Sequence, residues 1–118
     1  MSDKRSDSEV VRFGDLTLDL RSGELVRNGN RLLLPEQPFR ILARLVEKPG
    51  ALLTRDELRR ELWADDTFVD FEHSLNAAIK RLRAALDDDP QHPRFIETVP
   101  RRGYRWIHTS VLRKVRLA

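Results

Sequence analysis

The sequence of 118 residues contains no cysteine, which excludes disulfide bonds, thiolate metal sites and cysteine nucleophiles. It also lacks an apolar run near the roughly 18–20 residues of a membrane-spanning helix, since the longest candidate, Leu32 to Leu34, is three residues long. Residues 1–9 are polar, carry both signs of charge and have no apolar segment, so they do not resemble a secretory signal. We expect a disordered leader at 1–9, followed by a single globular domain.

Acidic residues are missing from two stretches of the C-terminal half. From Thr98 to the C-terminus the chain has six basic residues and no acid. From His73 to Leu86 it has Lys80, Arg81 and Arg83, again without an acid. The net charge of the whole chain is only +3 and does not by itself indicate a nucleic-acid partner. The local concentration of basic charge does favour such a partner.

The apolar pattern predicts short strands first and helices afterwards. Alternating apolar residues over 10–34, with Asn28-Gly29 as a tight turn, indicate a small antiparallel sheet. Helical spacing then predicts a first helix at 36–48. Thr54 and Glu57 form a capping box, which is typical of the start of a helix, and they predict a second, shorter one.

The second half of the chain predicts a third helix and a final hairpin. The helix is expected at 71–87 with Asp70 as its N-cap, and two strands at 95–99 and 104–107 enclose a tip at 100–103. Three helices followed by a hairpin, here called the wing, predict an α+β domain of the winged helix-turn-helix class.

The third helix has two chemically different faces. At about 100° per residue, one face collects the apolar residues Leu75, Ile79, Leu82 and Leu86. The opposite face carries His73, Ala77, Lys80, Arg81 and Ala84, flanked by Asn76 and Arg83. Arginine, lysine and asparagine side chains can donate to base edges in a major groove. An ordinary solvated helix face is the alternative, although such a face usually mixes both signs of charge.

The tip of the wing offers a second basic group. Arg101 and Arg102 precede Gly103, and together they fit a minor groove or the flanking phosphates. Thr98 and Tyr104 could donate hydrogen bonds to phosphate oxygens. The alternative is a charged, exposed loop with Tyr104 and Trp106 in the core, and for Trp106 we favour the core.

Two segments carry a resemblance to a known family. TFVDFEHSLNAAIKRLR at 67–83 and FIETVPRRGYR at 95–105 resemble the C-terminal winged-helix domain of OmpR/PhoB-type transcriptional regulators, in particular the CadC/ToxR-like branch. The resemblance spans residues 10–108 and implies a four-stranded N-terminal antiparallel sheet, three helices and a C-terminal wing. It also implies sequence-specific binding of double-stranded DNA by a bacterial regulator, head-to-tail homodimers on direct repeats and contact with RNA polymerase.

The resemblance also assigns roles to individual residues. DNA contacts are expected from the third helix, from the wing and from Trp63, and RNA polymerase contacts from the loop before the third helix. The expected DNA-binding residues are His73, Asn76, Lys80, Arg81, Arg83, Thr98, Arg101, Arg102, Tyr104 and Trp63, and the expected polymerase-contacting residues are Asp65, Asp66, Thr67 and Phe68.

The sequence departs from the family at Pro100, where many members have an arginine, so the contact of the wing is expected to move to Arg101 or Arg102. Ala77 and Ala84 replace larger polar residues of some relatives, so the target sequence does not carry over. Residues 109–118 are expected to form a basic tail or the start of a linker. The location is expected to be cytoplasmic, whether or not the domain belongs to a longer or membrane-anchored regulator.

Two other function classes remain as alternatives. His73, His92 and His108 do not show metal-ligand spacing, and Asp65-Asp66 has no neighbouring histidine or nucleophile, so we expect neither an enzyme, nor a metal site, nor a cofactor. A winged helix that binds another protein through an exposed Phe68 and Phe71 is the second alternative. Binding to duplex DNA that weakens with salt would distinguish DNA recognition from it.

Overall fold

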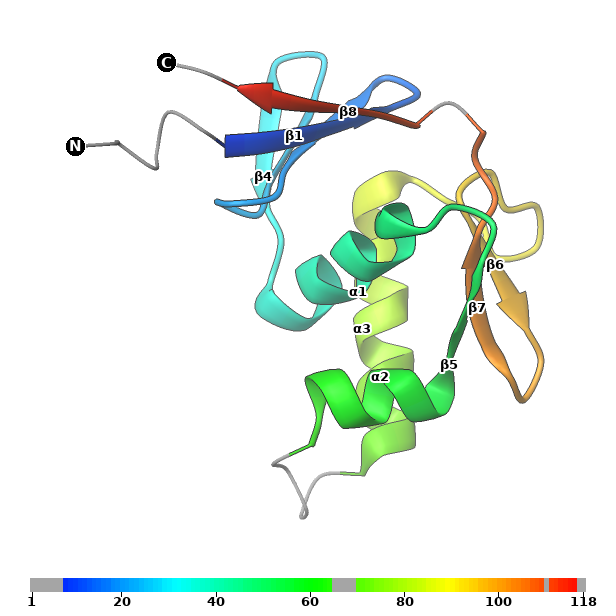
Figure 1. Ribbon diagram of the computed structural model, residues 1–118. Coiled ribbons are helices and arrows are strands. Elements are labelled where there is room, and N and C mark those ends of the chain that lie inside the picture. The colour runs from blue at the N-terminus through cyan, green and yellow to red at the C-terminus, as the bar shows by residue number, and fades with distance from the viewer. Residues whose placement is uncertain (1–7, 65–69, 110, 117–118) are drawn as a thin grey trace.

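The computed structural model describes residues 8–64, 70–109 and 111–116 (Figure 1). Three helices lie between a larger sheet formed mainly by the N-terminal strands and a smaller sheet that contains the wing. In chain order the elements are β1 (Ser8–Phe13), β2 (Leu16–Asp19), β3 (Glu24–Arg27), β4 (Asn30–Leu33), α1 (Glu36–Glu47), β5 (Leu52–Thr54), α2 (Arg55–Leu62), α3 (Phe71–Leu86), β6 (Ile96–Val99), β7 (Gly103–Trp106) and β8 (Val111–Arg116).

The N-terminal sheet confirms the four predicted antiparallel strands, which pair in the order β4-β3-β2-β1. Alternate residues on the inner face of these strands are buried, among them Val11, Phe13 and Leu18. The turn between β3 and β4 has Asn28 at φ 50° and Gly29 at φ 82°. Two successive positive φ angles match the right-handed twist of a hairpin, which is why the Asn-Gly pair was informative.

Both ends of the predicted domain need correction. β1 begins at Ser8, inside the expected leader at 1–9. Residues 111–116, expected as part of a basic tail or linker, instead form β8, which pairs antiparallel with β1 from Ser8↔Arg116 to Phe13↔Val111. The backbone of β1 already bonds β2 on one side, and β8 satisfies its other side. A fifth strand therefore completes the N-terminal sheet.

The first two helices form where the sequence predicts them. α1 buries Ile41, Leu42 and Leu45, and it ends at Glu47, one residue before the predicted boundary. At the start of α2, the backbone N–H of Glu57 donates to Thr54 Oγ1, and the backbone N–H of Thr54 donates to Glu57 Oε1, each at 3.0 Å. The predicted capping box is therefore confirmed. Among the described residues, no helix has both the length and the apolar character needed to cross a membrane.

The third helix confirms the predicted division into two faces. Asp70 caps its start by accepting a hydrogen bond from the backbone N–H of His73 at 3.3 Å. Asp87 ends it in the left-handed region at φ 56°. The buried side chains of α3 are Phe71, Leu75, Ala78, Ile79, Leu82 and Leu86. The inner face is therefore the predicted apolar stripe, and the cationic side chains lie on the other side.

The smaller sheet has the order β5-β7-β6 and joins the wing to the helices. The sequence did not predict β5, which pairs with β7 from Leu52↔Arg105 to Thr54↔Gly103. A Cβ atom at position 103 would lie 2.1 Å from the carbonyl oxygen of Leu53, so only glycine allows β5 to approach. Trp106 is 1% exposed and packs edge-on against Phe13 with ring centroids 4.9 Å apart, which confirms its predicted place in the core.

Candidate nucleic-acid interface

The outer face of α3 is open to solvent. From His73 onward six side chains are exposed along it, namely His73, Asn76, Ala77, Lys80, Arg81 and Ala84, and Glu72 is exposed in the first turn. They occupy successive turns of one rigid helix whose inner face is fixed in the core. The two alanines on this face have short side chains, so an approaching surface can come near the helix backbone. The structure therefore presents amide and cationic donors on a ridge.

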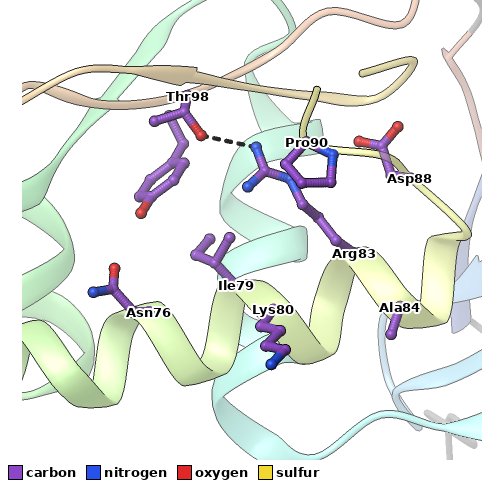
Figure 2. Close-up of a pocket in the computed structure, with 9 residues that line it drawn as sticks. Asn76, Ile79, Lys80, Arg83, Ala84, Asp88, Pro90 and Thr98 are labelled. Carbon is purple, nitrogen blue, oxygen red and sulfur yellow. Dashed lines mark hydrogen bonds between the residues drawn. The ribbon is translucent and has the colours of Figure 1, made fainter. Parts of the chain in front are cut away.

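A groove of about 520 Å³ separates α3 from the wing, and we call it the wing-side groove (Figure 2). Its floor includes the buried side chains of Ile79 and Tyr104, while Asn76, Lys80 and Thr98 are exposed. The residues that line it are Asn76, Ile79, Lys80, Arg83, Ala84, Asp88, Pro90, Thr98 and Tyr104. An extended polar chain would meet donors from both the helix and the wing in this groove.

A second groove, of about 490 Å³, lies on the other side of α3, and we call it the α1-side groove. It is lined by Pro35, Glu36, Gln37, Pro38, Trp63, His73, Ser74, Ala77, Ala78 and Arg81. Trp63 is 8% exposed and packs in a T-shaped contact against Phe71 with centroids 5.4 Å apart, so little of its ring is available to this groove. The ridge of α3 thus has one groove on each flank.

The tip of the wing is a tight turn that exposes two guanidinium groups. The backbone N–H of Arg102 donates to the carbonyl of Val99 at 3.0 Å. Pro100 occupies the second position of this turn, and Arg101 occupies the third at φ 66°. A positive φ at the third position is typical of a type II turn, where glycine or asparagine is usual. The turn projects the exposed side chains of Arg101 and Arg102.

Arg83 differs from the other predicted DNA-binding residues of α3 because its side chain turns toward the wing. Its Nη2 donates to the carbonyl of Ile96 at 3.0 Å and to Thr98 Oγ1 at 2.8 Å. Figure 2 shows the guanidinium reaching from the helix to the strand. Arg83 therefore forms part of the wall of the wing-side groove.

A buried carboxylate that the sequence did not explain holds the start of the wing. Asp88 is 7% exposed. Its Oδ1 accepts hydrogen bonds from the backbone N–H groups of Arg94 at 2.7 Å and Phe95 at 3.2 Å, and its Oδ2 accepts one from Ile96 at 2.9 Å. The acidic run at 87–89 was a signal of such a turn, because aspartate commonly satisfies backbone donors in loops.

Acidic side chains between α1 and α2 are paired with arginine. Arg44 Nε lies 2.5 Å from Glu61 Oε1, and this hydrogen bond lowers the pKa of Glu61 while it raises the pKa of Arg44. The backbone N–H of Thr54 lowers the pKa of Glu57 in the capping box. At the start of α3, Glu72 forms an ion pair with Arg55. Each of these carboxylates therefore has a hydrogen-bond or ion-pair partner within the domain.

One predicted interaction residue has a different position. Phe71, proposed as an exposed residue of a protein-binding surface, is 8% exposed, and the guanidinium of Arg59 lies 5.4 Å from its ring centroid. The prediction of an exposed Phe71 is therefore wrong, because its ring completes the core beside Trp63. The predicted polymerase-contacting residues Asp65, Asp66, Thr67 and Phe68 lie outside the described residues.

A family model described as "Transcriptional regulatory protein, C terminal" matches residues 29–106. The chain belongs to this family. The matched region contains all three helices and both strands of the wing, so the ridge and its two grooves lie within the family domain. The strands β1, β2, β3 and β8 lie outside the matched residues.

Relatives and solved structures extend the similarity across the family domain. A cholera toxin homolog transcriptional activator of Vibrio parahaemolyticus is 40% identical over 109 residues, which are 92% of this chain and 30% of that protein. The DNA-binding domain of Escherichia coli CadC has a TM-score of 0.71 at 32% identity, covering 90% of this chain and 97% of that chain.

The DNA-binding domain of Klebsiella pneumoniae RstA, solved in complex with the RstA box, has a TM-score of 0.69 at 31% identity, covering 83% of this chain and 96% of that chain. The chain therefore corresponds to the whole of two isolated domains. It spans only 30–45% of the length of the curated relatives that it matches.

Proposed function

We propose that this domain binds double-stranded DNA with sequence preference and serves a bacterial transcriptional regulator. The observation that carries the proposal is the exposed outer face of α3, which carries no acid from His73 to its end and stands as a ridge between two grooves. A helix in the major groove lies between two sugar-phosphate backbones, and the two grooves provide space for them. The similarity to a DNA-binding domain in complex with its target box supports this reading.

We expect the exposed side chains on the outer face of α3 to recognise the bases. Asn76 can pair with the N6 and N7 edge of adenine, and Arg81 can donate to O6 and N7 of guanine. Lys80 and His73 are exposed beside them and can reach bases or phosphates. Ala77 leaves room for close approach.

We expect the wing and the walls of the two grooves to provide the part of the affinity that does not depend on DNA sequence. Arg101 and Arg102 project from the tip toward the minor groove or its phosphates. The hydroxyl of Thr98 is available to a phosphate in the wing-side groove, while Tyr104 is only 4% exposed and could offer little more than its polar end. Trp63 lines the α1-side groove and could contact a phosphate there through the small exposed part of its side chain.

The wider assembly follows from the same proposal. We expect two copies to bind head to tail on direct repeats, RNA polymerase to be contacted through Asp65 to Phe68, and the domain to work in the cytoplasm. These features depend on the whole regulator. The curated relatives are more than twice as long as the region over which they match this chain.

Selection of bound duplexes from a random pool tests the proposal directly. A shared motif should emerge, and its affinity should fall with salt with a log–log slope of about −4 to −5, as expected for about four to six phosphate contacts. A pool without enrichment, or binding that does not depend on salt, would overturn DNA recognition and favour a protein partner.

Single variants on the selected site separate the two roles. Asn76→Ala or Arg81→Ala should weaken the preferred site by about 1–3 kcal/mol and should relax base preference. Arg102→Ala should weaken preferred and unrelated sequences to a similar extent. Arg21→Ala removes an exposed arginine from the turn between β2 and β3 and is the matched control, for which we expect native binding. Equal losses on all sequences for Arg81→Ala and Arg102→Ala would contradict this assignment.

A further inference from the structure

Arg83 connects α3 to the wing through a single nitrogen. The two hydrogens of Nη2 meet two acceptors on β6, the carbonyl of Ile96 at 3.0 Å and Thr98 Oγ1 at 2.8 Å (Figure 2). The side chain is half-buried, and Arg83 Nε is buried without a hydrogen-bond partner among the described residues. Nη2 therefore directs both of its donors to β6, and Nε is buried as well.

The contact also determines what Thr98 can do. A hydroxyl oxygen that accepts a hydrogen bond still has its own hydrogen to donate. Thr98 is exposed and lines the wing-side groove, so that hydrogen is available to an acceptor in the groove. Donation from a cation polarises the hydroxyl and makes it a better donor. A phosphate oxygen is the acceptor that duplex DNA would supply.

Arg83 and Asp88 together determine where the wing stands. Asp88 binds the backbone N–H groups of Arg94, Phe95 and Ile96, which fixes the beginning of β6 against the end of α3. Arg83 binds the same strand at Ile96 and at Thr98, farther toward the tip. Two successive attachments hold β6 at a constant separation from α3, and this separation is the width of the wing-side groove.

We propose that Arg83 is a positioning residue, which sets the wing against α3 and acts on DNA through the hydroxyl of Thr98 without contacting DNA itself. This inference rests on the proposed function, and it gives Arg83 a different task from that of Lys80, which is exposed on the same helix. Lys80 serves as the direct phosphate contact of this wall.

Salt dependence of DNA binding separates the two tasks. We compare Arg83→Gln, Thr98→Val, their double variant and Lys80→Gln on the selected duplex, each below its own unfolding midpoint. Lys80→Gln should reduce the magnitude of the log–log salt slope by about one, because a cation leaves a phosphate. Arg83→Gln should weaken binding by about five- to twentyfold, the equivalent of one or two hydrogen bonds, and should keep the native slope.

The double variant tests whether Arg83 acts through Thr98. The loss of affinity in Arg83→Gln with Thr98→Val should be clearly smaller than the sum of the single losses on a free-energy scale. Additive losses, or a slope reduced by about one in Arg83→Gln, would overturn the inference. If the native domain binds no duplex in a salt-dependent way, the proposed function fails as well, so the two failures are distinguishable.

Arg83→Lys provides a second variant in case Arg83→Gln does not fold. A direct phosphate contact would survive this exchange with most of its affinity, because lysine also binds phosphate as a point charge. A positioning role requires the planar geometry that reaches two acceptors on β6, so Arg83→Lys should lose affinity while the slope stays native. Retention of native affinity in Arg83→Lys would overturn the inference.

Discussion

The guanidinium of Arg27 on β3 donates from Nη2 to the backbone carbonyl of Leu86 at 2.8 Å, although the two residues lie 59 positions apart. Leu86 is the last residue of α3, where helix carbonyls have no partner within the helix and the helix dipole is negative. On its other side, Arg27 Nε lies 3.5 Å from Asp15 Oδ2. The N-terminal sheet therefore holds the C-terminal end of the helix that we expect to read DNA.

Arg27→Met should lower the free energy of unfolding by about 1.5–3 kcal/mol, because it removes a partly buried hydrogen bond from a charged donor. Urea-induced unfolding monitored by tryptophan fluorescence measures this loss. Arg31→Met is the control, since Arg31 is 72% exposed and its ion pair with Glu24 spans 3.7 Å. We expect a change within about 0.5 kcal/mol for the control, and equal losses in both variants would contradict a specific role for Arg27.

Asp88→Ala should be among the most destabilising substitutions of a polar residue in this domain. It removes the acceptor of three backbone N–H groups, of which those of Phe95 and Ile96 are buried. Leaving buried donors without partners costs about 1–3 kcal/mol each, so we expect a loss of about 3 kcal/mol or more in urea-induced unfolding.

The neighbouring Asp89→Ala is the control for Asp88→Ala. Asp89 is exposed, and its Oδ1 accepts from the backbone N–H of Gln91 at 2.9 Å. We expect its loss to be clearly smaller than that of Asp88→Ala, because water can replace the carboxylate. If Asp88→Ala were as mild as Asp89→Ala, the Asp88 contacts would not anchor the wing.

Short-range signals explain how much of this fold the sequence could predict. The capping box of Thr54 and Glu57, the turn at Asn28-Gly29 and the apolar stripe of α3 are determined by residues within a few positions of one another. Each was predicted and each is confirmed. The composition of the outer face of α3 was likewise readable from helical periodicity alone.

Long-range pairing explains what the sequence could not predict. β5 has three residues and becomes a strand because β7 binds it some fifty positions later, and β8 pairs with β1 from the opposite end of the chain. The position of Arg83 on the helix was predicted correctly, but the direction of its long side chain depends on where β6 lies. The acidic run after α3 conflicts with the helix dipole locally, and only the loop contacts of Asp88 account for it.

Acid should weaken the contact between α1 and α2. Hydrogen bonding to Arg44 lowers the pKa of Glu61 below its ordinary value of 4.5. A carboxylate with a lowered folded-state pKa contributes stability above its unfolded-state pKa, and this stability is lost as the pH falls through the folded-state value. We therefore expect Glu61→Gln to make the decline of unfolding free energy shallower between about pH 5 and pH 3.

The partner arginine provides the matched test. Arg44→Met should flatten the same acid limb, because the pKa of Glu61 then returns toward its ordinary value. The double variant should be no flatter than Arg44→Met alone, since the loss of Arg44 already removes the interaction with Glu61. Urea-induced unfolding at constant ionic strength across this pH range measures all three. An acid limb as steep in Glu61→Gln as in the native domain would show that other carboxylates dominate.

Arg101→Gly should change stability and DNA binding in opposite directions. Arg101 lies at φ 66°, where an L-residue carries about 1–2 kcal/mol of strain. Glycine relieves this strain but adds about 0.5–1 kcal/mol of unfolded-state flexibility, so a net gain of up to about 1.5 kcal/mol is expected in urea-induced unfolding. The same change removes an exposed cation from the wing tip and should reduce the salt slope of DNA binding by about one.

Arg102→Ala separates charge from backbone strain at the same tip. Arg102 is exposed like Arg101 but does not have a positive φ, so its removal should weaken DNA binding without any gain in stability. If the side chain of Arg101 had no part in DNA binding, its replacement by glycine would relieve the strain without any loss of DNA affinity. If Arg101→Gly stabilised the domain and left DNA affinity unchanged, the strained arginine would have no part in binding, whereas a loss of affinity beside a gain in stability would show that the wing holds this cation at the expense of folding free energy.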